Sequence, residues 1–108
     1  MEQPVSNERR NLPRCPTAVR VQPLDGGSWM MAQDLSFGGM LVTTAEPRWP
    51  GSFIPVAFVL ERGEEPIEAL CQVMDLVEVP RGIGLALRFI RMPEGGRARL
   101  GDFLEGVA

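Results

Sequence analysis

Apolar and polar residues alternate with a period of two along most of the chain, which is the pattern of half-buried β-strands. The alternation is clearest over residues 83–89, where isoleucine, two leucines and phenylalanine occupy every second position. Alternation or a short apolar run also predicts strands at residues 17–22, 28–33, 40–44, 53–60 and 67–74. These strands, joined by short turns, indicate an all-β fold in which an antiparallel sheet curls into a six-stranded β-barrel and removes its exposed edges.

The two ends of the chain depart from this alternation. Residues 1–16 are polar, contain three prolines and have no periodicity, so we expect them to form a mobile N-terminal arm. After Pro93, four apolar residues at helical spacing predict a short C-terminal helix: Leu100, Phe103, Leu104 and Val107. Nearby glycines weaken this helix unless it packs against the barrel. The chain therefore divides into the N-terminal arm (1–16) and a single barrel domain (17–108).

Composition and charge restrict the class of partner. The net charge of −3 argues against a general affinity for nucleic acid, which needs a broad basic surface. Arg9, Arg10 and Arg14 against Glu2 and Glu8 nevertheless give residues 1–14 a charge of +1, so a compact anion can be bound there. No apolar stretch approaches the roughly 20 residues of a membrane span, and the N-terminus lacks the apolar core of a signal peptide. We therefore expect a cytoplasmic protein without membrane insertion.

The residues available for catalysis and metal binding are few. The chain contains no histidine, which removes the usual general base for a nucleophile such as Ser36 or Cys15. Cys15 and Cys71, 56 positions apart, match no zinc spacing and are expected to be reduced, small apolar side chains. Trp29 and Trp49 are expected to cover the rim or core of the barrel rather than to stack on a ligand. We predict no catalytic residue, no metal site and no cofactor.

The segment "DLSFGG" at residues 34–39 has more polar and flexible residues than a hairpin turn requires. The carboxylate of Asp34 can accept the two N–H donors on the Watson–Crick edge of guanine, while an arginine pairs with O6 and N7 of the same base. Gly38 and Gly39 allow a backbone to approach a ligand closely. Together with the arginines of the N-terminal arm, this set fits a guanine nucleotide. The alternative is that Asp34 and Ser36 only cap amides of the turn, and that the arginines are a solvated stretch.

Two motifs occur in a fixed order along the chain. An R-x-x-x-R motif lies at Arg10 and Arg14, and a D-x-S-x-x-G motif lies at Asp34, Ser36 and Gly39. In this order, on an all-β chain, they resemble the PilZ domain, the bacterial receptor module for cyclic di-GMP. The resemblance runs from the N-terminal arm through the "PRGIGLALRF" strand to the closing helix. It implies the split-barrel form of the six-stranded antiparallel barrel.

The resemblance also implies roles for individual residues. Arg10 and Arg14 would contact phosphate and the Hoogsteen edge or face of guanine, while Asp34 and Ser36 would bind its other edge. Gly39 would shape the turn, with Gly38 beside it. An arginine at the position of Arg9 accompanies two stacked ligand molecules in the family, so the ligand is expected as a stacked dimer.

The resemblance further implies a stand-alone receptor that regulates motility or biofilm formation through a protein effector. Cyclic di-GMP would draw the N-terminal arm onto the barrel, because its two phosphodiester charges neutralise arginines that otherwise repel one another. Two alternatives stay open. One is an adaptor of the same fold that binds a protein and no nucleotide, and the other is a hydrolase that uses Asp34 and Ser36.

Overall fold

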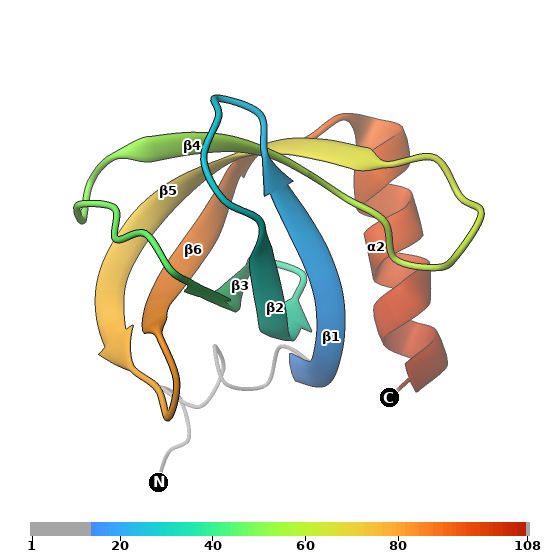
Figure 1. The fold of residues 1–108 in the computed structure, drawn as a ribbon. Helices are drawn as coiled ribbons and strands as arrows, with labels where there is room; N and C mark the ends of the chain where they lie inside the picture. The colour runs from blue at the N-terminus through green and yellow to red at the C-terminus, as the bar shows by residue number, and fades with distance from the viewer. Residues whose placement is uncertain (1–13, 108) are drawn as a thin grey trace, which may run out of the picture.

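The computed structural model describes residues 14–107, and within this range the chain forms strands followed by one C-terminal helix (Figure 1). The predicted mobility of the N-terminal arm falls mainly on residues 1–13, which lie outside the described residues. The elements are β1 (Arg14–Pro23), β2 (Met30–Ser36), β3 (Gly39–Thr44), β4 (Phe53–Phe58), β5 (Ile67–Glu78), β6 (Ile83–Arg91) and α2 (Glu94–Val107).

The strands form a closed barrel in the order β1-β2-β3-β6-β5-β4, and every neighbouring pair is antiparallel. The predicted all-β, six-stranded antiparallel barrel with a C-terminal helix is confirmed. The closing pair, β1 with β4, is short and extends only from Val21 to Pro23 on β1. The barrel is therefore joined along this side by fewer paired residues than along any other.

Several strand boundaries differ from the prediction. β1 begins at Arg14 instead of residue 17, and β2 continues to Ser36 through a segment predicted as a link. Both extensions come from the same ladder, because Arg14 pairs with Ser36 and Pro16 pairs with Asp34. One bulge in this ladder and another between β2 and β3 break the alternation of apolar residues, and so hide the strand ends from a search for period two.

The interior of the barrel is filled by side chains from every strand. Phe58 and Phe89 stack with their ring centroids 5.9 Å apart. Cys71 of β5 is fully buried, and desolvation raises the pKa of its thiol to about 12. At neutral pH this thiol is protonated and serves as a small apolar side chain, as predicted. The largest fully buried side chains also include Leu35, Met40, Ile54, Leu85, Leu100, Val21, Val42, Val56 and Val73.

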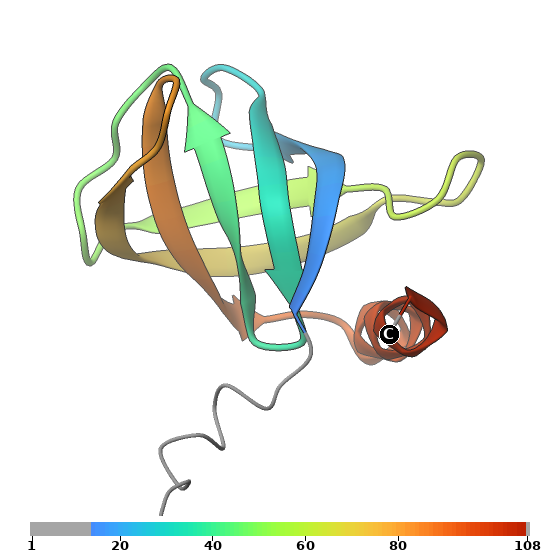
Figure 2. The ribbon, with the colours of Figure 1, turned by 90° about the horizontal axis from the view of Figure 1, so that it is seen from below.

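The helix α2 lies beside the barrel, next to β1 (Figure 2). Leu100 and Leu104 on its inner side are buried, at the spacing the sequence predicts. Gly96 permits a close approach, since a Cβ there would lie 2.9 Å from Cγ2 of Ile67 at the start of β5. At the outer side, Arg99 forms an ion pair with Glu64 at 3.2 Å. No helix in residues 14–107 is long and apolar enough to cross a membrane.

Candidate functional site

The ladder between β1 and β2 brings Arg14, the second arginine of R-x-x-x-R, beside the D-x-S-x-x-G motif. The Cα atom of Arg14 lies opposite that of Ser36, and the Cα atom of Pro16 lies opposite that of Asp34. Residues opposed in an antiparallel pair have Cα atoms about 4.5 to 5.5 Å apart. The second arginine of R-x-x-x-R and the first half of D-x-S-x-x-G therefore lie at one corner of the barrel, where β1 starts and β2 ends. Arg9 and Arg10 lie outside the described residues.

A bulge in β2 sets the direction of Asp34. Against β3, the strand contains one extra residue between Ala32 and Asp34. Ala32 and Leu35 are both buried. Of the two residues between them, Gln33 is exposed and Asp34 is half-buried. In a regular strand Asp34 would share the inward face of Ala32. The bulge thus turns a carboxylate away from an apolar core and places it at the outer surface.

Ser36 is buried and closes the turn between β2 and β3. Its hydroxyl donates a hydrogen bond to the carbonyl oxygen of Gly39 and accepts one from the amide of Gly39, both at 3.2 Å. This is the turn-forming role that the sequence left open as an alternative. Ser36 therefore stabilises the corner whether or not its hydroxyl also contacts a ligand.

The two glycines of this turn have different surroundings. A Cβ atom on Gly39 would collide with the carbonyl oxygen of Leu87 on β6, because β3 and β6 approach closely there. A Cβ atom on Gly38 would meet nothing within 4 Å. Neither Gly38 nor Gly39 has a positive φ, so the turn does not depend on left-handed backbone. Gly39 is thus required by strand packing, and Gly38 leaves the backbone open to solvent.

Sequence reasoning missed a contact between this turn and α2. The guanidinium of Arg97 lies over the ring of Phe37, 5.5 Å from the ring centroid, within the range of a cation–π interaction. Phe37 lies at the tip of the turn and is partly exposed, and in Figure 2 the tip points to the side of the barrel where α2 lies. Sixty positions separate the two residues, so no local pattern links them. The contact adds a cation and an aromatic face beside the corner.

The exposed tryptophans lie away from this corner. Trp29 precedes β2, at the end opposite Ser36, and is half exposed, with the Arg20 guanidinium 4.4 Å from its ring centroid. Trp49, in the loop before β4, is 80% exposed, so the prediction that it covers the rim or core is wrong. Its loop is held by backbone contacts, including a 2.7 Å hydrogen bond from the Gly51 amide to the Val73 carbonyl, and not by burial of the indole. Among residues 14–107, no cluster of three His, Cys, Asp or Glu side chains could bind a metal ion.

The family model of the PilZ domain matches residues 8–106. The chain belongs to the PilZ domain family. No curated protein matches it with significance. The structure of the Bacillus subtilis inhibitor of motility, MotI/DgrA, aligns with a TM-score of 0.77 and 20% identity, over 92% of this chain and 49% of that chain.

Two structures of YcgR from Escherichia coli have the same fold as this PilZ domain. The complex of YcgR with c-di-GMP aligns with a TM-score of 0.71 and 19% identity, over 91% of this chain and 45% of that chain. The PilZ domain of YcgR with c-di-GMP aligns with a TM-score of 0.68 and 20% identity, over 92% of this chain and 91% of that chain. The chain thus spans about half the length of MotI/DgrA and of the longer YcgR chain. At these identities the alignments establish the shared fold.

The packing of the turn in this PilZ domain predicts a difference between its two glycines. We expect Gly39→Ala to lower the free energy of unfolding by about 1 to 3 kcal/mol, because the added methyl group must push β3 away from β6. Gly38→Ala, the matched control, should change it by no more than about 0.5 kcal/mol. Urea denaturation followed by circular dichroism measures both. Equal effects of the two substitutions would contradict the assignment of Gly39 to strand packing.

Proposed function

We propose that this PilZ domain is a cytoplasmic receptor for cyclic di-GMP that has no catalytic activity and signals to a partner protein. The observation that carries the proposal is the register of β1 against β2, which puts Arg14 opposite Ser36 and Pro16 opposite Asp34. The second arginine of R-x-x-x-R thereby lies beside the first half of D-x-S-x-x-G at one corner of a family member. The Escherichia coli YcgR structures and the structure of Borreliella burgdorferi PlzA are complexes with c-di-GMP, and they support the choice of ligand.

The proposed contacts follow from the chemistry of guanine and phosphodiesters. The carboxylate of Asp34, at the outer surface, accepts the N1–H and N2–H donors of one guanine. Arg10 and Arg14 pair with phosphate oxygens and with the O6 and N7 acceptors of the base. Ser36 fixes the turn and contributes its remaining acceptor capacity. Gly38 and Gly39 add no side chain to the turn, so the ligand approaches the backbone there.

The output is proposed to pass through a protein effector, in the regulation of motility or biofilm formation. A receptor that only binds its ligand needs a change that a second protein can detect. In this proposal, ligand binding draws the N-terminal arm onto the barrel beside Asp34, and the ordering entropy is offset by charge-assisted hydrogen bonds and base stacking. The repulsion between Arg9, Arg10 and Arg14 is relieved at the same time, because the ligand carries two negative charges.

Isothermal titration of the purified chain with cyclic di-GMP tests the proposal, with GTP and cyclic di-AMP as controls. We expect selective binding of cyclic di-GMP. Arg10→Ala or Arg14→Ala should each weaken it by about 1.5 to 3 kcal/mol, the range for hydrogen bonds to charged groups. The fold should persist, since the buried core of the described chain begins at Val19.

The matched control for these variants is Arg81→Ala, which removes an exposed arginine from the turn between β5 and β6, at the other end of the barrel from Asp34. It should bind cyclic di-GMP as the parent chain does. Absence of binding by the parent chain, with no chemical-shift change at Asp34 and Ser36, would exclude the receptor and favour the adaptor that binds no nucleotide. Turnover of a guanine nucleotide during the titration would favour the hydrolase.

The number of ligands per chain tests the role of Arg9. If Arg9 stabilises a stacked pair, the parent chain should bind about two molecules of cyclic di-GMP, and Arg9→Ala should bind about one. The same titration gives both stoichiometries. A parent chain that binds a single ligand, unchanged by Arg9→Ala, would remove the stacked dimer from the proposal.

Relaxation of backbone amides by NMR tests the ordering of the N-terminal arm. Amides of residues 1–13 should become more rigid on the nanosecond timescale when cyclic di-GMP is added, because the arginines are then bound. Amides of β5, remote from the corner, serve as the internal reference. Equal rigidity of the arm with and without ligand would contradict ligand-driven ordering, even if the titration shows binding.

A further inference from the structure

The barrel is open along part of the side where β1 meets β4. The paired residues run from Val21 opposite Phe58 to Pro23 opposite Val56, and the Leu24 amide extends the contact with a 2.7 Å hydrogen bond to the Pro55 carbonyl. Before Val21, β1 continues, but the chain after Phe58 leaves the sheet. Within residues 14–107, no strand pairs with Ala18–Arg20 on this side. These residues form a short unpaired edge of β1.

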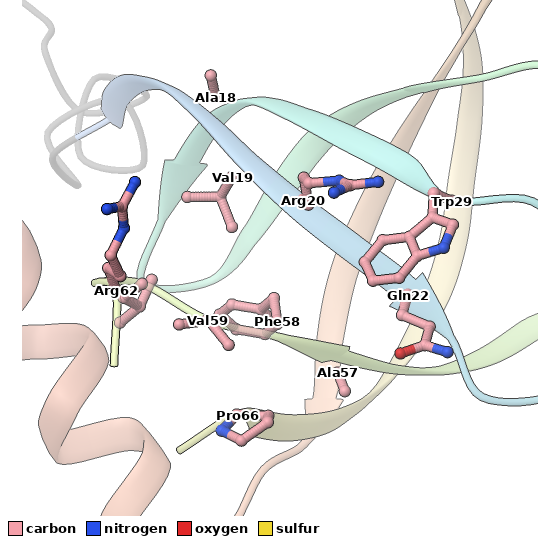
Figure 3. A pocket seen from close by; sticks show the side chains of 11 residues that line it. Ala18, Val19, Arg20, Gln22, Trp29, Ala57, Phe58, Val59, Arg62 and Pro66 are labelled. Carbon is pink, nitrogen blue, oxygen red and sulfur yellow. The ribbon is translucent and has the colours of Figure 1, made fainter. Parts of the chain in front are cut away.

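A groove of about 570 Å³ lies where the two strands diverge (Figure 3). We call it the seam groove: its sides are residues 18–20 and Gln22 of β1 and residues 57–60, with Trp29 at one end and Arg62 at the other. Val19 and Phe58 line it and belong to the buried core, so its floor is apolar. The side chain of Val59 is exposed beside it. The seam groove thus joins an apolar floor to an edge with free backbone hydrogen-bonding capacity.

The charge of the seam groove is opposite to that of the whole chain. Its lining contains two arginines, Arg20 and Arg62, and no acidic residue, whereas the net charge of the chain is −3. Among the described residues neither arginine forms an ion pair; Arg20 only lies over the ring of Trp29. Two arginines without an ion pair among residues 14–107, beside an apolar floor, favour an occupant that carries both apolar side chains and carboxylates.

We infer that the seam groove binds an extended, acidic segment of a partner protein, which adds as a strand to the edge at Ala18–Arg20. Backbone hydrogen bonds to an exposed edge give affinity in this mode of binding, and alternate side chains give specificity. Apolar side chains of the segment would face Val19 and Phe58. The acidic side chains between them would point outward to Arg20 and Arg62, because successive side chains of a strand point to opposite faces.

Two other occupants are disfavoured by charge. Residues 1–14 carry three arginines and a charge of +1, so Arg20 and Arg62 repel them. A second copy of this chain, paired edge to edge through β1 about a two-fold axis, would place its Arg20 opposite or diagonal to the first Arg20, where like charges destabilise the pair. A partner protein with an acidic strand meets neither penalty.

Selection of a phage-displayed library of random peptides on the full chain tests this inference. Enriched peptides should alternate apolar residues with aspartate or glutamate. A synthetic copy of the most enriched peptide should shift the NMR signals of the Ala18, Val19 and Arg20 amides. Arg62→Gln should raise its Kd by about tenfold, as expected for loss of a charge pair at an interface. Arg88→Gln, which removes one exposed arginine from β6 on the opposite side of the barrel from β1, should leave the Kd unchanged.

Several outcomes would overturn the inference. These are the absence of any enriched sequence, enriched peptides with no acidic bias, and signal shifts confined to other parts of the barrel. Dimerisation in sedimentation experiments, with the Ala18–Arg20 amides protected in the dimer, would assign the seam groove to a second copy instead. Each proposal can fail without the other when its ligand is tested alone: Arg62→Gln should not alter cyclic di-GMP binding without peptide, and Arg10→Ala should not alter peptide binding without cyclic di-GMP.

Discussion

The register of β1 against β2 is the constraint on which both the core and the candidate site depend. If β2 kept strict alternation from Ala32 to Leu35 instead of forming a bulge, the inward face would carry the carboxylate of Asp34 and Leu35 would point to solvent. A second bulge, between Pro16 and Val19, inserts one extra residue into β1 opposite the same part of β2. It lets Val19 and Val21 fill the core while Arg14 stays in register with Ser36. Core packing and site assembly are therefore satisfied by the same two bulges.

The alternation of apolar and polar residues was enough to predict the barrel, because one face of the sheet packs in the apolar core and the other faces water. It failed where that alternation is interrupted. Arg14 was assigned to the arm since two prolines and polar residues surround it, although the β1–β2 ladder includes it. Asp34 and Ser36 were placed in a link because the alternation is also broken there. A bulge turns both Gln33 and Asp34 outward, and the polar residue Ser36 is buried. Trp49 was misjudged because size and apolarity do not reveal that its loop is anchored through backbone contacts.

At the candidate site, the structure shows Arg14, Asp34 and Ser36 near one another, whereas Arg9 and Arg10 lie outside the described residues. Arg14, Asp34 and Ser36 meet because the consecutive strands β1 and β2 pair from the start to the end of β2, which the motifs indicated only through resemblance to the family. The turn-forming role of Ser36 is local and was one of the two sequence-based alternatives, whereas the requirement for glycine at position 39 depends on Leu87 of β6 and was not visible locally. The position of Arg97 over Phe37 depends on how α2 docks, so it required the three-dimensional structure.

The two proposed binding regions share β1. Arg14 at the start of this strand and Ala18 at the unpaired edge are four residues apart, about 13 Å at the rise of a strand. The irregularity between Pro16 and Val19 lies between them, and it is the part of β1 where the ladder to β2 is already interrupted. If the proposed ligand orders the start of β1, the ordered segment adjoins the residues that present the edge. Any such coupling must be reciprocal: if cyclic di-GMP strengthens binding of an acidic strand, that strand strengthens binding of cyclic di-GMP by the same factor.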